Sequence, residues 1–569
     1  MYNLVGKGGI SSPTCCHIAM LTIAFVATLS PLGYTVQRRQ VEVEFYISHS
    51  QGHGVYYLGE SIEFNIVAVN RGDASIPPST IEYEIVDFYG NVIKKDTFSI
   101  EEIPAHSTNT YAVKISADEN KTRSYCDIYA YWLSGTETIS SARSSYCTIP
   151  KDIQNLSDIS PFFGLCSGAL FHLNMKDIPT VGERRLELHR RLGAPSGRND
   201  LWWNEIEPEK GKFVWEKCDL VVETYKKYNL DLLGILCYYS SWEPNVAPAA
   251  NAELLHYFAN YAREVVVRYG KYVKYWEVWN EPNVKVFWQP QPNPKDYYIM
   301  LKSVYEAIKD VNKDAQVIGM VTSLCDTDFI DKVLSCGGDK YVDVISIHPY
   351  CEDGVSAADR VAEFNKIFSL RALLGRYNLS NLPIWVTEMG WKSIYSSGYV
   401  EGKVSFSEAK NMERMQAKYI SQLYPYALAK GFIERLYYFN LSDWEEKDAF
   451  GEGHYGLLHA DYTPKPSYLA YRTIIERIGS KKFISTVEVN KKDVHAYLFS
   501  GRSGAATEEV IILWSQRGKK TVILKLPVSW KDKKHLLIYD MLGNYKEIAV
   551  EGETMELKID EEPIYVVAR

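Results

Sequence analysis

Two glutamates in this chain follow apolar, tryptophan-rich runs, and their setting predicts a pair of carboxylates that work together. Glu281 lies in the run Trp-Asn-Glu-Pro at residues 279–282, which closes the apolar segment 275–278. Glu388 lies in a similar run, Ile-Trp-Val-Thr-Glu-Met-Gly-Trp, at residues 384–391. Both segments are typical of buried strands, so each carboxylate would lie at a strand end. Paired carboxylates of this kind are the groups that cleave glycosidic bonds.

The elements that would carry these glutamates alternate between strands and helices. Strand-like runs in the middle of the chain are followed by apolar residues at helical spacing, as at Leu301, Val304 and Ile308. With a shorter strand near residues 193–198, the pattern gives about eight β-then-α units, which is the number and order of a parallel (β/α)8 TIM barrel. A doubly wound parallel sheet is the alternative. The other predicted strands are residues 163–166, 232–237, 273–279, 317–321, 342–347, 384–387 and 433–439.

On either side of this region the apolar pattern is that of antiparallel sheets. Residues 38–152 contain short alternating runs, such as 62–69 and 81–86, with turn residues between them. This spacing predicts an N-terminal, Ig-like β-sandwich. Residues 480–569 repeat the pattern and predict a smaller C-terminal β-sandwich, which leaves residues 153–479 for the barrel.

Residues 1–37 are predicted to be a signal peptide or an N-terminal anchor. Lys7 precedes an apolar run at residues 18–29, and Ser-Pro-Leu-Gly follows it at residues 30–33. Because the run is shorter than the ~20 residues of a comfortable membrane span, a cleaved secretory signal is favoured over an uncleaved anchor. We therefore expect a secreted or cell-surface protein, with membrane association through this segment as the alternative.

The composition of the 569 residues excludes several other functions. A net charge of −8 without a basic cluster argues against a nucleic-acid partner. Neither a metal nor a cofactor is expected, because the sequence has no Cys/His spacing of a zinc site and no nucleotide or flavin motif. Cys126 and Cys147 lie in adjacent strand-like runs, and export would permit a disulfide between them. The 13 Trp and 42 Tyr residues suit a carbohydrate groove as well as a core.

Polar residues at the carboxyl ends of barrel strands face the active-site mouth. The strand count places Glu281 on the fourth strand and Glu388 on the seventh, so that the two would face each other across the mouth. Their separation would then approach the ~5–5.5 Å of enzymes that retain the anomeric configuration. Unequal environments would keep one carboxyl protonated for the leaving oxygen and the other ionised for attack.

The motifs resemble those of a known group of enzymes. Residues 279–283 resemble the acid/base signature of the clan of retaining glycoside hydrolases with glutamates on barrel strands four and seven, and residues 387–391 are similar to the nucleophile segment of that clan. Within the clan, the chain is most similar to family 39. Residues 198–208 resemble the segment after the second strand, and residues 456–466 resemble the approach to the last helix. The resemblance covers residues 159–479.

This resemblance implies a retaining glycoside hydrolase that acts on an extracellular oligo- or polysaccharide. It makes Glu281 the general acid/base and Glu388 the nucleophile. Asn280 would hydrogen-bond the 2-hydroxyl of the sugar, a contact that strengthens in the transition state. Tyr350 would donate to Glu388, and Arg198 would keep that carboxylate ionised; a structural ion pair is the alternative for Arg198.

Three further residues are candidate sugar contacts. His348 ends a predicted strand, with a purely structural histidine as the alternative, and Trp242 and Trp444 would offer flat faces to sugar rings. Glu277 lies deeper in the same strand as Glu281 and is given no catalytic role. A transglycosylase on the same scaffold and a non-catalytic carbohydrate-binding protein are the competing functions. Only a catalyst needs both glutamates.

Overall fold

The computed structural model of the chain describes residues 42–167, 170–350, 364, 366–393, 406–444, 452–503 and 506–569. These residues form two compact units: residues up to 150 together with 460–464 make one, and the remaining residues make the other. The predicted signal or anchor, residues 1–37, lies outside the described residues. Within the described ranges, no helix is both long enough and apolar enough to span a membrane.

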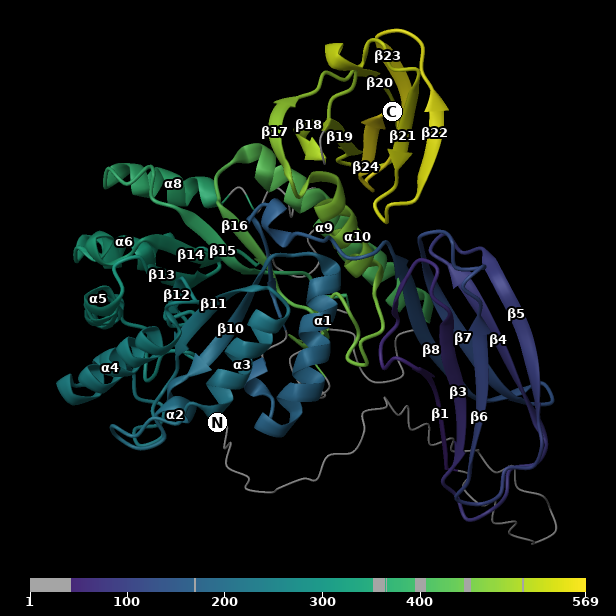
Figure 1. Ribbon diagram of the computed structural model, residues 1–569, viewed down its shortest axis with the longest axis horizontal. Coiled ribbons are helices and arrows are strands. Elements are labelled where there is room, and N and C mark those ends of the chain that lie inside the picture. The colour runs from purple at the N-terminus through teal and green to yellow at the C-terminus, as the bar shows by residue number, and fades with distance from the viewer. Residues whose placement is uncertain are drawn as a thin grey trace, which may run out of the picture. The chain divides into compact units, whose positions relative to one another are not determined.

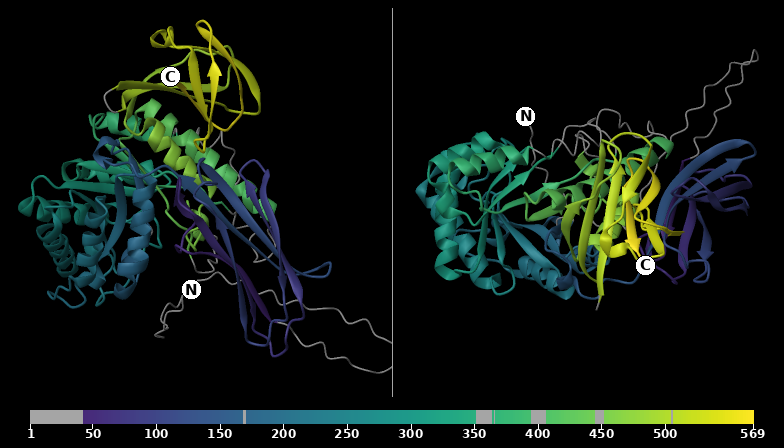
Figure 2. Two further views of the ribbon diagram at one scale, coloured as in Figure 1. Left: turned by 45° about the vertical axis from the view of Figure 1, so that its right-hand side comes forward. Right: turned by 90° about the horizontal axis from the view of Figure 1, so that it is seen from above.

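The larger unit is built around a closed barrel of parallel strands, which confirms the predicted TIM barrel (Figures 1 and 2). Neighbouring strands pair in chain order, and the last strand closes onto the first. The strands are largely buried, because one face fills the barrel and the other lies under the helices. They are β9 (Phe163–Cys166), β10 (Ser196–Trp202), β11 (Asp231–Cys237), β12 (Tyr275–Val278), β13 (Gln316–Ser323), β14 (Val344–His348), β15 (Ile384–Met389) and β16 (Arg435–Tyr438).

Helices follow the strands and lie on the outside of the barrel (Figure 1). Helix α5 begins after Asn293, whose side chain caps the first turn, and it buries Leu301, Val304 and Ile308 as their spacing predicts. The helices are α1 (Glu183–Leu192), α2 (Trp203–Ile206), α3 (Glu216–Lys227), α4 (Ala252–Tyr269), α5 (Pro294–Val311), α6 (Thr327–Ser335), α8 (Ile367–Arg376), α9 (Phe406–Lys430) and α10 (Pro466–Ile478).

Two strand boundaries differ from the prediction and matter for the site. β10 begins at Ser196 instead of residue 193, because Gly193 has a φ of 91° and terminates α1, and it continues to Trp202 through its pairing with β11. Arg198 therefore lies inside its strand. β12 ends at Val278, one residue earlier than predicted, because Trp279 has a φ of 70° and leaves the extended conformation.

The same unit contains the C-terminal sheets, which confirm the predicted all-β region (yellow in Figure 1). Helix α9 is joined to them by ion pairs: Arg414 donates from Nη2 to Glu562 at 3.0 Å, and Lys418 lies 2.7 Å from Glu561. The first sheet contains β17 (Lys481–Thr486), β18 (Val494–Ser503), β19 (Ala506–Ser515), β24 (Ile564–Ala568), β21 (His535–Tyr539) and β22 (Tyr545–Ala549), and the second contains β20 (Lys520–Lys525) and β23 (Thr554–Ile559).

The smaller unit consists of two sheets around one apolar core, which contains Phe64, Tyr83 and Trp132. Residues 460–464 also belong to it, which was not predicted. The hydroxyl of Ser145, for example, donates to the carbonyl of Pro464 at 2.5 Å. One sheet contains β1 (Val43–His49), β3 (Ile62–Asn70) and β6 (Thr108–Ile115), and the other contains β2 (Val55–Tyr57), β8 (Glu137–Ile149), β7 (Ser124–Ser134), β4 (Ser79–Asp87) and β5 (Val92–Ile100).

The disulfide that export would permit is not formed. Cys126 and Cys147 are both buried, and neither forms a disulfide. Strands β7 and β8 pair so that Cys126 lies opposite Tyr146 and Cys147 lies opposite Tyr125. Because successive side chains of a strand point to opposite faces, this register of one position places the two sulfurs on opposite faces of the sheet.

Candidate active site

Glu281 follows β12 in a turn that is held away from extended geometry. Trp279 and Glu281 have φ values of 70° and 43°, conformations that cost of order 1–3 kcal/mol each for residues other than glycine. Packing maintains the turn: Trp279 is fully buried, its backbone N–H donates to Leu236 at 3.0 Å, and its indole N–H donates to Phe287 at 2.9 Å. The turn brings the Glu281 carboxylate to the carboxyl end of the barrel.

Glu388 lies near the end of β15 and accepts a hydrogen bond on each carboxylate oxygen. Tyr350 donates its hydroxyl to Oε2 at 2.9 Å, and Arg198 donates from Nη1 to Oε1. Burial would raise the pKa of Glu388, but the positive charges of His348 and Arg198 and the Tyr350 hydrogen bond outweigh burial and hold the pKa below its ordinary value. These contacts favour the ionised form of Glu388.

His348 lies between the two glutamates. Its Nδ1 is 2.8 Å from Oε1 of Glu281 and 3.7 Å from Oε2 of Glu388, and its Nε2 is 3.0 Å from the hydroxyl of Thr387. Burial opposes the charged form, but the nearby charges of Glu388 and Glu281 are stronger and raise the pKa of His348. Since the side chain is fully buried, it offers no surface to a sugar. The predicted sugar contact is therefore replaced by contacts with both glutamates.

Glu388 lies on the seventh strand of the barrel and Glu281 directly follows the fourth, which matches the strand count of the prediction. One carboxylate oxygen of Glu281 and one of Glu388 lie within 4.8 Å of each other. This separation is close to the ~5–5.5 Å that suits a covalent intermediate and shorter than the ~6.5–9.5 Å that leaves room for an inverting water. The geometry favours direct attack by one carboxylate on the substrate.

Arg198 contacts two of the predicted site residues, Glu388 and Asn280. Its guanidinium is almost fully buried and donates to Glu388, to the side-chain oxygen of Asn280 at 2.8 Å and to Glu277. Arg198 therefore contacts Glu388, as predicted, and also forms a buried ion pair with Glu277. Because the Asn280 oxygen is occupied by Arg198, its NH2 group is oriented as the donor for a ligand.

The two candidate tryptophans lie in different surroundings. Trp444 is 47% exposed and its ring centroid is 6.5 Å from that of Phe439, which in turn packs edge-on against Tyr350. Trp242 packs edge-on against Trp203, with ring centroids 5.4 Å apart. Trp444 is thus partly exposed to solvent in the neighbourhood of Glu388. Trp242 instead packs against Trp203.

Sequence reasoning missed two groups near the eighth strand. Tyr455 lies 5.7 Å from Tyr350 between ring centroids. Lys465 is fully buried and donates to Asp443 at 2.7 Å. Burial would raise the pKa of Asp443, but Lys465 together with His454 and His459 outweighs burial and holds the pKa below its ordinary value. The one available signal was Asp443 itself, a carboxylate just after a predicted strand; its lysine partner is 22 residues away in the sequence.

In the described part of the chain, the His, Cys, Asp and Glu side chains close enough to share a metal ion are Glu281, His348 and Glu388. These are the residues of the acid pair. The adjacent Arg198 guanidinium would repel a cation, and both nitrogens of His348 already have hydrogen-bond partners. The donor set therefore fits proton and glycosyl transfer better than metal binding.

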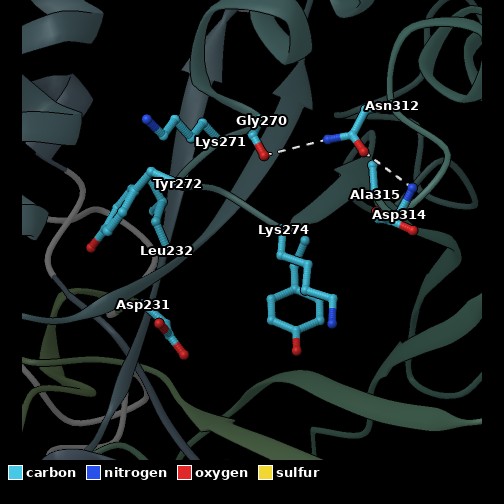
Figure 3. Close-up of a pocket in the computed structure, with 10 residues that line it drawn as sticks. Asp231, Leu232, Gly270, Lys271, Tyr272, Lys274, Asn312, Asp314 and Ala315 are labelled. Carbon is cyan, nitrogen blue, oxygen red and sulfur yellow. Dashed lines mark hydrogen bonds between the residues drawn. The ribbon is translucent and has the colours of Figure 1, made fainter.

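A separate pocket lies at the amino ends of β11, β12 and β13, opposite the end that carries the glutamates (Figure 3). Its volume is about 400 Å³. Within it, the Asn312 amide donates to the carbonyl of Gly270 at 3.3 Å, and its side-chain oxygen accepts from the N–H of Asp314 at 3.1 Å (Figure 3). This end of a TIM barrel serves stability, so the pocket is distinct from the candidate active site.

Comparison with known families gives two matches. The profile described as "Glycosyl hydrolases family 39" matches residues 238–525, which is half of the chain. The profile "Glycosyl hydrolase family 10" matches residues 174–286. A β-xylosidase of Geobacillus stearothermophilus is 25% identical over 342 residues, which are 53% of this chain and 61% of that enzyme. The chain thus aligns with less than two thirds of the length of this relative.

Solved structures share the fold. A family 39 glycoside hydrolase from the gut symbiont Bacteroides cellulosilyticus WH2 superposes with a TM-score of 0.67 and 23% identity over 92% of this chain and 100% of that one. A monomeric β-xylosidase from Caulobacter crescentus CB15 superposes with a TM-score of 0.52 and 16% identity, over 72% of this chain and 97% of that one. At these identities the likeness establishes the architecture around the two glutamates.

Proposed function

Because the chain belongs to family 39 of the glycosyl hydrolases, we propose that it is a retaining glycosidase that works by double displacement. The observation that carries the proposal is the pair Glu281 and Glu388, whose carboxylate oxygens lie within 4.8 Å of each other on opposite strands. Their environments differ, since Glu388 accepts from Arg198 and Tyr350 while Glu281 contacts His348. Unequal environments are what two carboxylates with unequal roles require.

In the first step Glu388 is the nucleophile. Its ionised carboxylate attacks the anomeric carbon, and the bond between that carbon and the leaving oxygen breaks. Glu281 gives its proton to the leaving oxygen, so the aglycone departs as an alcohol and a glycosyl ester forms on Glu388. The amide of Asn280 donates to the sugar 2-hydroxyl, in a contact that strengthens as positive charge develops on the ring.

In the second step Glu281 acts as a base. It takes a proton from a water molecule, the water oxygen attacks the anomeric carbon, and the ester bond to Glu388 breaks. Both carboxyl groups return to their starting states, and two inversions give net retention. Trp444, with its exposed ring, is the candidate platform for the sugar that leaves or for its neighbour.

The substrate is an oligo- or polysaccharide, and the relatives direct the first assays. Two of them are named β-xylosidases, so aryl β-xylosides head a panel that also contains other aryl β-glycosides and plant and microbial glycans. The export expected from residues 1–37 would place this activity outside the cell. N-terminal sequencing of protein from culture medium and from washed membranes tests export and signal cleavage together.

Stereochemistry and azide rescue test the mechanism. The first product released from an aryl glycoside should have the same anomeric configuration as the substrate by NMR. Glu388→Ala should lose turnover, and added azide should restore it with an inverted glycosyl azide. Glu207→Ala, which removes another buried glutamate that bonds Trp203 and Gly211, should retain the wild-type stereochemistry. An inverted wild-type product, or full activity in Glu388→Ala, would refute the proposal.

A further inference from the structure

A third glutamate lies behind the acid pair. Glu277 is fully buried on β12, four residues before Glu281. Its Oε1 accepts two hydrogen bonds from Arg198, one from Nε at 3.0 Å and one from Nη2. Its Oε2 is buried and has no hydrogen-bond partner among the described residues.

This arrangement is costly for a purely structural contact. Burying a carboxylate and a guanidinium requires desolvation that their attraction only partly repays, and apolar side chains of similar volume are often as stable or more stable. Apolar side chains fill much of the barrel, with Leu233, Ile318 and Val344 in one cluster. A buried carboxylate with one oxygen unpaired therefore indicates a role beyond filling the barrel.

The guanidinium geometry shows what that role is. Arg198 uses Nε and Nη2 toward Glu277, Nη2 also toward Asn280, and Nη1 toward Glu388. Because the five N–H groups of arginine lie in one rigid plane, a carboxylate that fixes one side of the plane also fixes the other. The groups that face the substrate, Glu388 and Asn280, are thus oriented from behind.

We propose that Glu277 is a positioning residue that acts on Glu388 and Asn280 through Arg198, an inference that rests on the proposed retaining mechanism. It touches no substrate. It holds the guanidinium so that one N–H reaches the nucleophile and another holds the amide that meets the 2-hydroxyl.

Glu277 also matters for the change of charge that occurs in the first step. Arg198 faces two carboxylates before the reaction, but Glu388 loses its charge when it becomes a glycosyl ester. Without Glu277, the buried guanidinium would then face only neutral groups, at a large electrostatic cost. Glu277 keeps Arg198 paired through that step, which lowers the barrier to forming the ester.

The test is Glu277→Gln, which keeps the shape of the side chain and removes its charge. We expect inactivation by a 2-deoxy-2-fluoro aryl glycoside to slow by about tenfold or more, the scale of one lost charge-assisted hydrogen bond, while its binding constant changes by less than about threefold. The acidic limb of kcat/KM should move to lower pH, because loss of a neighbouring negative charge lowers the pKa of Glu388.

Glu207→Gln is the matched control, since it makes the same change at a buried glutamate that bonds Trp203 and Gly211 instead of Arg198. Its rate and pH profile should match the wild type. A folded Glu277→Gln with wild-type rate and acidic limb would overturn the proposal, and so would an equal effect from the control.

Two further measurements keep the inference separate from folding and from the proposed function. If Glu277→Gln does not fold, Glu277→Asp keeps the charge but withdraws it by one methylene, and the inactivation rate should fall with the acidic limb unmoved. Failure of both variants to fold would assign a structural role and refute the proposal. NMR titration of Glu388 with side-chain 13C labels needs no substrate. A lower pKa in Glu277→Gln would support the inference even if no glycoside were cleaved, and an equal pKa would contradict it.

Discussion

Tyr350→Phe offers a quantitative test of how Glu388 is kept ionised. The substitution removes one hydroxyl that donates to Oε2 of Glu388 at 2.9 Å and leaves the ring in place. A hydrogen bond to a charged group contributes about 1.5–3 kcal/mol. Because the hydrogen bond stabilises the ionised carboxylate, its loss should raise the pKa of Glu388.

The sign of this effect on activity follows from the protonation state that attack requires. The Tyr350 hydrogen bond favours the ionised form and is one of the contacts that hold the pKa of Glu388 below its ordinary value. Its removal raises that pKa, so the nucleophile is protonated at higher pH and the acidic limb of kcat/KM moves upward. Arg198 and His348 still favour the anion, and activity at neutral pH should survive in part.

The assay is the pH profile of kcat/KM on an aryl glycoside with a good leaving group, so that acid catalysis by Glu281 is not limiting. Tyr471→Phe is the control, because that buried hydroxyl donates to the carbonyl of Gly164 at 2.9 Å instead of to Glu388. An acidic limb that stays at the wild-type pH in Tyr350→Phe would refute the reasoning, as would an equal shift in the control.

The same substitution makes a prediction for stability. A carboxyl whose pKa is lowered in the folded protein stabilises the fold above its unfolded pKa, and this contribution disappears as the pH falls through the folded value. Tyr350→Phe should therefore lower the free energy of unfolding at pH 7 by about 1.5–3 kcal/mol. The difference from the wild type should shrink as the pH falls below the ordinary glutamate range. Urea unfolding at several pH values measures both.

Three other predictions concern separate parts of the molecule. Glu281→Ala should still form the glycosyl-enzyme from substrates with good leaving groups but hydrolyse it slowly. A burst of released leaving group should therefore precede a slow steady state. Normal activity on natural glycans would contradict the acid/base role. Trp444→Ala should raise KM on oligosaccharides, since it removes the apolar ring face on which a sugar would pack, with a smaller effect on aryl monosides. Reductant should leave the melting temperature unchanged, because Cys126 and Cys147 form no disulfide; a clear decrease would indicate one.

The barrel and its two glutamates were predictable because they leave local signals. Apolar runs separated by helical spacing give the order of strands and helices, and a carboxylate directly after such a run marks the active-site end. The strand count alone placed Glu281 and Glu388 on opposite sides of the mouth. The identity of each strand was sufficient for this, although β10 and β12 end at residues other than those predicted.

Other features depend on register and on long-range packing, which the pattern does not carry. A shift of one residue between β7 and β8 decides that Cys126 and Cys147 point apart. The ion pair between Lys465 and Asp443 joins positions on either side of segment 460–464, which folds with the N-terminal sheets. Likewise, the position of Glu277 deep in its strand was predictable, but its pairing with Arg198 was not, because that contact joins two different strands.

The two residues behind the nucleophile allow a joint test of the charge argument. Tyr350 donates to Glu388 and lowers its pKa, whereas Glu277 adds a negative charge near it through Arg198 and raises it. The single variants Tyr350→Phe and Glu277→Gln should therefore move the acidic limb in opposite directions. In the double variant the two shifts should largely cancel, while the rate of ester formation stays low because both orienting contacts are gone. A double variant whose limb follows only one of the single variants would show that Glu388 does not respond to the two groups independently.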